Sequence, residues 1–194
     1  MNICVFSSSS NALYEIYFEA ARQLGKLIGT GGHQLIYGGT NVGLMEETAK
    51  AVRLTGAKTV GVIPRRIHDK ELSSDENEEQ IITDNMRDRK YFMRKRSDAF
   101  IALPGGFGTL EEILEVITLK QLHYHNKPVV LVNVNGFFDS LLQQFERSFE
   151  ETFAREEYRK LYFIADSAAD AMKYIESYKP ELLTTKWYNV PRGK

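Results

Sequence analysis

The feature that most constrains the fold is a regular alternation of short apolar segments with longer amphipathic ones. The short segments are rich in β-forming residues and lie at 3–6, 34–37, 59–63, 81–82, 99–103, 129–134 and 161–164. The longer segments carry apolar residues at helical spacing and lie at 13–28, 42–54, 86–96, 109–122, 137–149 and 168–178. Apolar strands that alternate with amphipathic helices predict a parallel sheet covered by helices on both faces.

Local signals refine this pattern. Asn11 is expected to cap the first helix, and Gly31 with Gly32 to end it. Residues 65–80 are polar and are expected to form a long loop. No repeat or linker divides the chain, so we expect one α/β domain over residues 1–180, followed by a tail at 181–194.

Composition excludes several classes of protein. The 194 residues include 25 Lys and Arg against 26 Asp and Glu, and this balance gives no reason to expect a nucleic-acid partner. The single cysteine, Cys4, forms neither an internal disulfide nor a thiolate metal site. No apolar run approaches the ~18 residues of a membrane span. Since the first ten residues also lack a basic leader, we expect a cytoplasmic protein without membrane contact.

Ligands of doubly wound parallel sheets bind beyond the carboxyl ends of the strands, and one loop at that edge carries the strongest signal. It follows the predicted strand at 99–103 and reads PGGFGTLEE over residues 104–112. Its glycines let the backbone approach a ligand closely, and the next helix points free N–H groups into the loop. A tight turn without a ligand is the alternative, but the combination favours a phosphate site.

Two carboxylates follow this loop directly. Acidic residues favour the first turn of a helix because of its dipole, which is sufficient to explain Glu111. The dipole explains Glu112 less well if that side chain faces a phosphate-binding cleft. A carboxylate beside a phosphate brings a second negative charge into the cleft, which needs a chemical reason. Glu112 is therefore a candidate catalytic residue.

Two other loops offer weaker signals. Gly38 and Gly39 follow the predicted strand at 34–37 and can let a nucleoside lie against the backbone. A simple turn with a close contact at Gly43 is an equally good interpretation. The serines at 7–10 follow the first strand, where their hydroxyl and N–H groups can hold a base, ribose or phosphate, although serine-rich turns are common without a ligand.

The segment 86–96 carries six basic residues and one acid. One or two of these cations can reach an anionic ligand, whereas most are expected to be solvated or paired with the acidic stretch at 71–79. A nucleic-acid patch is the last alternative. The chain has no GxxxxGK[ST] motif, and no GxGxxG follows the first strand, so neither a P-loop ATPase nor a hydride-transferring dinucleotide enzyme is expected.

Three motifs in fixed order resemble a known family. They are YGGTNVGLM at 37–45, MRDRK at 86–90 and PGGFGTLEE at 104–112, and they resemble the LOG (LONELY GUY) family of cytokinin riboside 5′-monophosphate phosphoribohydrolases, once described as possible lysine decarboxylases. The resemblance covers about residues 1–165. It implies a Rossmann-like, doubly wound parallel sheet with helices on both faces, a nucleotide-binding domain and a homodimer. It implies no cofactor and no metal.

The resemblance also implies a reaction and a site. The family hydrolyses the N-glycosidic bond of N6-substituted adenosine 5′-monophosphates, and in many members of AMP, to the free base and ribose 5-phosphate. Arg89 and Glu112 match its catalytic residues. The residues and the resemblance together assign nucleotide or phosphate binding to Ser8, Gly38, Gly39, Glu71, Met86, Arg89, Lys90, Gly105, Gly106, Phe107, Gly108, Thr109, Glu112 and Thr118.

The sequence departs from the family pattern at several positions. Thr40 and Glu46 replace glycines, Ser7–Ser8 stands where Cys–Gly is common, and Arg87–Asp88 where His–Glu is common. We expect Thr40 and Glu46 to bear on the preferred base or substituent rather than on the reaction. The main alternative function is a non-catalytic nucleotide-binding or sensor protein on the same fold. A pyridoxal-dependent decarboxylase has no support from chain length or motif order.

Overall fold

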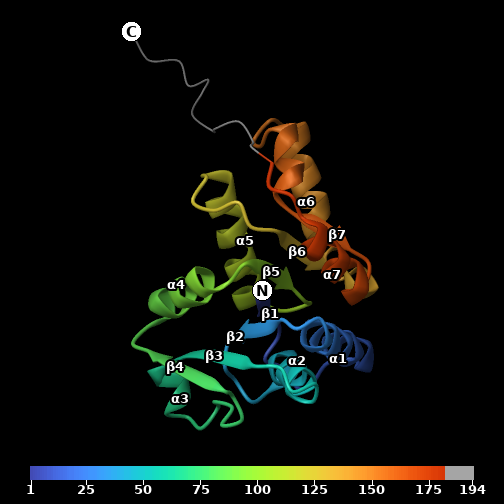
Figure 1. The fold of residues 1–194 in the computed structure, drawn as a ribbon. Helices are drawn as coiled ribbons and strands as arrows, with labels where there is room; N and C mark the ends of the chain where they lie inside the picture. Colours follow the sequence, from blue (N-terminus) through green and yellow to red (C-terminus); the bar gives the residue numbers. More distant parts are fainter. Residues whose placement is uncertain (182–194) are drawn as a thin grey trace.

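The computed structural model describes residues 1–181, and its centre is one seven-stranded sheet (Figure 1). Every neighbouring pair of strands is parallel, and the order is β4-β3-β2-β1-β5-β6-β7. The strands are β1 (Asn2–Phe6), β2 (Gln34–Tyr37), β3 (Thr59–Pro64), β4 (Glu79–Thr83), β5 (Ala99–Ala102), β6 (Val129–Val132) and β7 (Phe163–Ala165). The predicted parallel α/β fold is confirmed. Most of the predicted tail lies outside the described residues.

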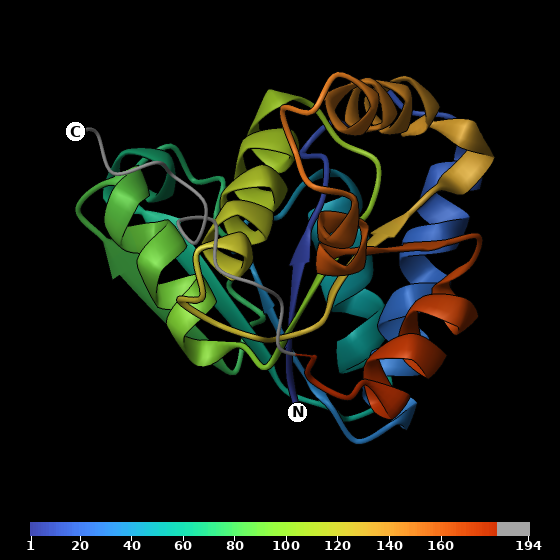
Figure 2. The same cartoon turned by 90° about the horizontal axis from the view of Figure 1, so that it is seen from above.

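Helices cover both faces of the sheet. They are α1 (Glu15–Thr30), α2 (Gly43–Arg53), α3 (Arg65–His68), α4 (Met86–Arg96), α5 (Phe107–Gln121), α6 (Asp139–Glu150) and α7 (Ala168–Ser177). Side chains alternate along each strand, so Ile3 and Val5 join one apolar cluster with α1, α2 and α7. Cys4 and Phe6 join the other cluster with α4, α5 and α6. Figure 2 shows α1 (blue) and α7 (red) on the opposite side of the sheet from α4 (green) and α5 (yellow-green).

The strand order places the site. The chain starts in the centre with β1, moves outward through β2, β3 and β4, and then returns to pair β5 with the other edge of β1. The loops after β1 and β5 therefore leave the sheet in opposite directions, which opens a crevice at its carboxyl edge. The serine loop at 7–10 and the glycine-rich loop at 104–109 flank this crevice.

Several local predictions were wrong. The segment 65–80 begins with the short helix α3 and ends in β4, so it is only partly a loop. Asn11 does not cap α1, which starts after Tyr14; its side chain instead accepts a hydrogen bond from Gly43 N at 2.8 Å. Helix α5 begins two residues earlier than expected, because Gly106 already has extended backbone and ends the loop. Within residues 1–181, no helix is both long and apolar enough to cross a bilayer.

Helices α1 and α2 pack closely through a glycine. A Cβ on Gly25 would collide with the Thr48 carbonyl oxygen and lie 2.7 Å from Ala51 Cβ. Gly25 is buried in the middle of α1, where a glycine would otherwise only weaken the helix. The close approach of α2 is therefore the reason for glycine at this position.

Replacing Gly25 by alanine is expected to destabilise the fold. The added methyl improves helix propensity, but overpacking against the α2 backbone costs more, and the free energy of unfolding is expected to fall by about 1–3 kcal/mol. Urea titration followed by circular dichroism measures the change. Lys26→Ala, at the exposed neighbouring position, is the control and is expected to stay within about 0.5 kcal/mol. An unchanged or raised stability of Gly25→Ala would contradict this packing.

Candidate functional site

A cleft of about 760 Å³ lies at the carboxyl edge of the sheet, where the strand order opens the crevice. It receives residues from the loops after β1 and β2, from the segment after β3, and from the starts of α4 and α5. The lining residues are Ser7, Ser8, Ser9, Ser10, Thr40, Val42, Met45, Ile67, Lys70, Leu72, Met86, Arg89, Gly106, Phe107, Gly108, Thr109, Glu111 and Glu112. Segments far apart in the sequence therefore meet at one concave surface.

The N-terminus of α5 opens into this cleft. Its first intrahelical hydrogen bond joins Leu110 N to Gly106 O at 3.0 Å, and no side chain caps the helix. The amides of residues 107–109 precede that bond and have no acceptor inside the helix. Gly105 is buried behind these amides. A Cβ at this position would collide with the Thr109 hydroxyl, so the close packing requires glycine. This arrangement is suited to bind an anion.

The N-terminus of α2 also points toward the crevice, but its amides are occupied. Gly43 N donates to Asn11 Oδ1, and Leu44 N and Met45 N donate to the carbonyl oxygen of Ser8 at 2.9 and 3.4 Å. A Cβ on Gly43, whose φ is +64°, would lie 2.5 Å from the Ser9 backbone. Gly43 therefore docks the serine loop onto α2, whereas the turn interpretation expected its close contact to be with a strand.

A buried ion pair lies beside the free amides. Arg89 Nη1 is 2.6 Å from Glu112 Oε1, and the two side chains are only 8% and 9% exposed. Asn85 caps α4 by accepting from Asp88 N, which sets the helix so that Met86 and Arg89 both line the cleft. The sequence motifs containing Arg89 and Glu112 therefore meet in space.

The guanidinium of Arg89 is held on three sides. Its Nε donates to the Val62 carbonyl oxygen at 2.9 Å, which ties the side chain to the end of β3. A Cβ at Gly38 would collide with Arg89 Nη2 and lie 2.6 Å from the Met45 sulfur. Gly38 thus acts indirectly: it leaves the space that the guanidinium occupies, and it is not itself among the cleft-lining residues.

Burial and charge oppose each other at Glu112. Burial raises the pKa of its carboxyl group, and the positive charge of Arg89 offsets part of that rise. Arg89 occupies Oε1, and among residues 1–181 no donor contacts Oε2. The same part of the chain holds no group of three His, Cys, Asp or Glu residues that could bind a metal. The free oxygen of Glu112 can therefore act on a bound ligand as a base or as a negative charge.

Lys90, which was predicted to bind the nucleotide or phosphate, is not among the residues that line the cleft. Its ammonium pairs with Glu111 and lies 3.1 Å from Glu115, which also pairs with Arg94 at 2.8 Å. These ion pairs join α4 to α5. Arg96 is paired with Glu79, as expected for a cation beside the acidic stretch. Most of the basic segment thus has a structural role.

Four other predicted or singled-out positions lie away from the cleft. Glu71 is exposed with φ +59°. The Thr118 hydroxyl is bonded to Leu114 O on an exposed part of α5. Gly39, with φ +73°, packs against the backbone of β3, where its Cβ would lie 3.1 Å from Val62 N. Glu46 pairs with Arg53 at 2.5 Å and does not line the cleft, whereas Thr40 does.

The wall opposite α5 was not predicted. It contains Ile67, Lys70 and Leu72, from the segment expected to be a loop. This segment is held by long-range hydrogen bonds, from Asn41 N to Leu72 O at 3.0 Å and from Ser74 N to Gly39 O at 2.9 Å. The only sequence signal was the presence of two aliphatic residues in an otherwise polar stretch.

Comparison with protein families and curated proteins gives a consistent result. The model of the family described as "possible lysine decarboxylase" matches residues 45–175. A cytokinin riboside 5′-monophosphate phosphoribohydrolase of Arabidopsis thaliana is 41% identical over 98% of this chain and 89% of its own length. A probable enzyme of the same name from Oryza sativa subsp. japonica is 43% identical over 92% of this chain and 72% of its own length.

Solved structures with the same architecture include carrier proteins. The molybdenum cofactor binding protein from Rippkaea orientalis superposes with a TM-score of 0.70 at 27% identity, covering 91% of this chain and 95% of that one. The molybdenum cofactor carrier protein from Chlamydomonas reinhardtii gives 0.67 at 25% identity, covering 90% and 95%. The Rossmann-like fold is thus shared with proteins whose names describe binding.

Removal of Arg89 should destabilise the protein in a pH-dependent way. In Arg89→Met the pKa of Glu112 rises further, because burial is no longer opposed. Near pH 8 the variant must then bury an unpaired charge or protonate it, and we expect a loss of about 3–5 kcal/mol. The loss is expected to shrink as pH falls and the carboxyl is protonated. Urea unfolding at pH 5 and pH 8 measures the loss of stability and its dependence on pH.

The double variant Arg89→Met/Glu112→Gln is the matched control. It removes the unpaired charge, so it should recover part of the stability lost at pH 8 and show little of the pH dependence. Equal destabilisation at both pH values, or a double variant as unstable as Arg89→Met at pH 8, would contradict the assigned charge pair.

Proposed function

The chain belongs to the LOG family of cytokinin riboside 5′-monophosphate phosphoribohydrolases, and we propose that it hydrolyses the N-glycosidic bond of adenosine 5′-monophosphates, N6-substituted or plain, to the free base and ribose 5-phosphate. One observation carries the assignment of the site. The buried Glu112 carboxylate, held by Arg89, lies on the same helix whose first amides are open to the cleft.

The 5′-phosphate is assigned to the start of α5. The amides of Phe107, Gly108 and Thr109 donate to its oxygens, and the helix dipole favours its charge. The phosphate is remote from the bond that breaks. Its binding energy therefore serves to position the ribose against Glu112, which lies about 8 Å further along the same rigid helix.

Glu112 is assigned the catalytic role at the sugar. Breaking a ribosyl C–N bond builds positive charge on the ribose, as in glycoside hydrolysis. An ionised carboxylate beside C1′ stabilises that charge and can orient or deprotonate the attacking water. Because Oε1 is occupied by Arg89, the oxygen that acts is Oε2.

Arg89 keeps Glu112 ready for this role. Its charge opposes the rise in the pKa of Glu112 that burial causes, so a larger fraction of the carboxyl is ionised near neutral pH. The bonds to Val62 O and Glu112 fix the guanidinium in one orientation. Arg89 lines the cleft as well, so it can also contact the nucleotide directly.

The base is assigned to the apolar wall. Val42, Met45, Ile67 and Leu72 line the part of the cleft built by the segments after β2 and β3. Thr40 lies on the same side, where it replaces a family glycine, so it is the departure that bears on the preferred base. Glu46 is turned away and paired with Arg53, so it is not expected to affect this preference directly.

A non-catalytic nucleotide-binding protein is the alternative function. The structural similarity to carrier and binding proteins favours it, because the same fold serves proteins named for binding alone. Such a protein would hold a nucleoside monophosphate in the same cleft and release no base. Product analysis separates the two functions directly.

The homodimer is also part of this proposal. Phe107 is 92% exposed at the start of α5, and Tyr91 and Phe92 of α4 are 49% and 39% exposed. Apolar side chains of this size beside a cleft are typical of surfaces covered by a partner. Location in the cytoplasm and the absence of a nucleic-acid partner stay predictions.

Light scattering tests the homodimer. At micromolar concentration the purified protein is expected to have twice the 22.2 kDa mass of the chain. Phe92→Glu, which places a charge in the proposed interface, is expected to shift the population toward the monomer, because burying an unpaired charge is unfavourable. A monomeric wild-type protein would contradict the homodimer. The hydrolytic proposal does not depend on this outcome.

Glu112→Gln is expected to reduce base release by a factor of about 10²–10⁴, because the amide neither carries the charge nor accepts the proton. Nucleotide binding should stay within about tenfold of the wild type, since the α5 amides are intact. Chromatography of free base and ribose 5-phosphate from AMP and from isopentenyladenosine monophosphate measures the loss, and calorimetry measures binding.

Glu115→Gln provides the control for this experiment. Glu115 lies on the same helix but pairs with Lys90 and Arg94 and does not line the cleft, so turnover is expected to change only a few-fold. Near-normal turnover of Glu112→Gln would remove Glu112 from the mechanism. No base from either substrate with wild-type protein that still binds nucleotide would favour the non-catalytic function.

A further inference from the structure

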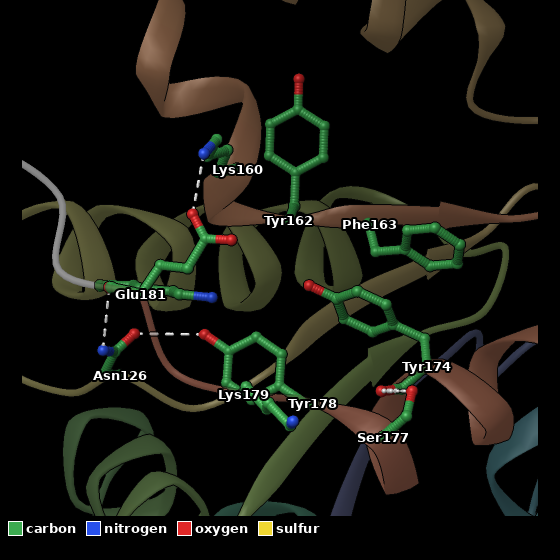
Figure 3. A pocket seen from close by; sticks show the side chains of 10 residues that line it. Asn126, Lys160, Tyr162, Phe163, Tyr174, Ser177, Tyr178, Lys179 and Glu181 are labelled. Atoms are coloured by element: carbon green, nitrogen blue, oxygen red, sulfur yellow. Dashed lines mark hydrogen bonds and ion pairs between the residues drawn. The ribbon is translucent and has the colours of Figure 1, made fainter.

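A second cavity, of about 400 Å³, lies at the amino edge of the sheet, opposite the cleft. It is bordered by the segments that lead into β6 and β7, by the end of α7, and by the end of α5 (Figure 3). Helix α5 connects the two places, because Glu112 lies near its start and Lys120 near its end, about 12 Å further along the axis. The second cavity is therefore separate from the candidate active site.

Aromatic rings form much of its wall. The rings of Phe163 and Tyr174 are stacked, with centroids 4.2 Å apart and planes at 5°. The ring centroids of Tyr178 and Tyr174 are 5.6 Å apart, with the ring planes at 55°. Tyr162 also lines the cavity (Figure 3). Flat apolar surfaces of this kind suit a planar ring, which can stack on a face or meet an edge.

Lys120 is the unusual residue of this cavity. It is only 4% exposed, and among residues 1–181 its ammonium has no hydrogen-bond partner. Its Nζ lies 4.8 Å from the ring centre of Tyr178, a cation–π contact that replaces only part of the lost hydration. Burial lowers the pKa of Lys120 to about 8. A buried ammonium without an acceptor is costly, so an anion at this position would be strongly favoured.

The charges around the cavity also favour an anion. Lys120, Lys160 and Lys179 line it, against a single carboxylate, that of Glu181. Glu181 is already engaged, because Lys160 Nζ lies 2.8 Å from its Oε2 (Figure 3). The lining thus has an excess of positive charge. Glu181 also acts electrostatically on Lys120, its most buried cation, but makes no hydrogen bond to that ammonium.

The polar groups at the rim are held in place by one another. The Tyr178 hydroxyl donates to Asn126 Oδ1 at 3.2 Å, and Asn126 Nδ2 donates to the Glu181 carbonyl oxygen at 3.1 Å (Figure 3). These bonds tie the end of α7 to the segment before β6. The ring that lies under Lys120 is therefore fixed before any ligand enters, which reduces the entropic cost of binding.

We propose that this cavity is a second ligand site, which binds a small planar aromatic anion with its ring packed against the tyrosine rings and its carboxylate or phosphate on Lys120. Both halves of the ligand are needed. The anionic group of the ligand pairs with the Lys120 ammonium, and its ring packs against the aromatic side chains of the cavity wall. The proposal does not depend on the reaction catalysed at the carboxyl edge.

The test is a titration of the full chain, followed by amide chemical shifts. Phenyl phosphate and benzoate are the probes, and inorganic phosphate and phenol each present one half of the ligand. Saturable shifts are expected at Asn126, Phe163 and Tyr178 with at least one aromatic anion. Inorganic phosphate and phenol are expected to bind at least about tenfold more weakly. The ratio between the two probes distinguishes a carboxylate from a phosphate ligand.

Lys120→Met is the decisive variant, because it keeps the length of the apolar stem and removes the charge. It is expected to weaken binding at least about tenfold, while Lys160→Met, at an exposed lysine already paired with Glu181, changes it only a few-fold. The dispersion of the same spectra reports whether each variant is folded. If Lys120→Met is unfolded, Tyr178→Leu, which removes the ring under the ammonium, takes its place and should weaken the aromatic anions more than inorganic phosphate.

Three results with the full chain would overturn the proposal. They are the absence of saturable shifts around the cavity at millimolar probe, equal affinity in the wild type and Lys120→Met, and shifts confined to residues 106–112. Shifts around the cavity that appear only after removal of residues 182–194 would also overturn it, because the site would then belong to the chain's own end.

Discussion

The buried pair of Arg89 and Glu112 is the interaction on which the rest of the site depends. It joins α4 to α5 across the carboxyl edge of the sheet, and the bond from Arg89 to Val62 O extends the connection to β3. Each partner makes the burial of the other tolerable, since either charge alone would be costly in that position. The pair also requires space, and Gly38 provides it by having no side chain. The candidate catalytic carboxylate, its orientation and a glycine on a distant loop are thus one physical unit.

The parts predictable from the sequence are those set by local patterns. Strand–helix alternation predicts the parallel sheet, and the rule that ligands bind at its carboxyl edge singles out the loop before α5 without any structural knowledge. The family resemblance adds Arg89, which no spacing argument pairs with Glu112. Membership of the family is confirmed by the relatives, whose names give the expected class of reaction. The roles of the individual site residues stay proposals.

The misses share one cause, which is that long-range contacts decide where a polar side chain goes. Lys90 carries the right charge for a phosphate, but Glu111 and Glu115 on the neighbouring helix pair with it first. Asn11 has the right chemistry for a helix cap, but it caps nothing on its own helix and contacts Gly43 instead. Ile67 and Leu72 reach the cleft because backbone hydrogen bonds to the loop after β2 fold their segment over it. Composition and periodicity carry no information on such pairings.

The unequal state of the two helix N-termini at the crevice has a consequence for selectivity. At α2 the Ser8 carbonyl and the Asn11 side chain already occupy the first amides, whereas the first amides of α5 have no acceptor within residues 1–181. A ligand with one phosphate can use the amides at the start of α5. The second phosphate of a nucleoside diphosphate, or the pyrophosphate of a dinucleotide, would not find a second open helix N-terminus at α2. Under the proposed assignment of the phosphate to α5, closure of the α2 N-terminus by the chain's own backbone favours a ligand with one phosphate group over a ligand with two.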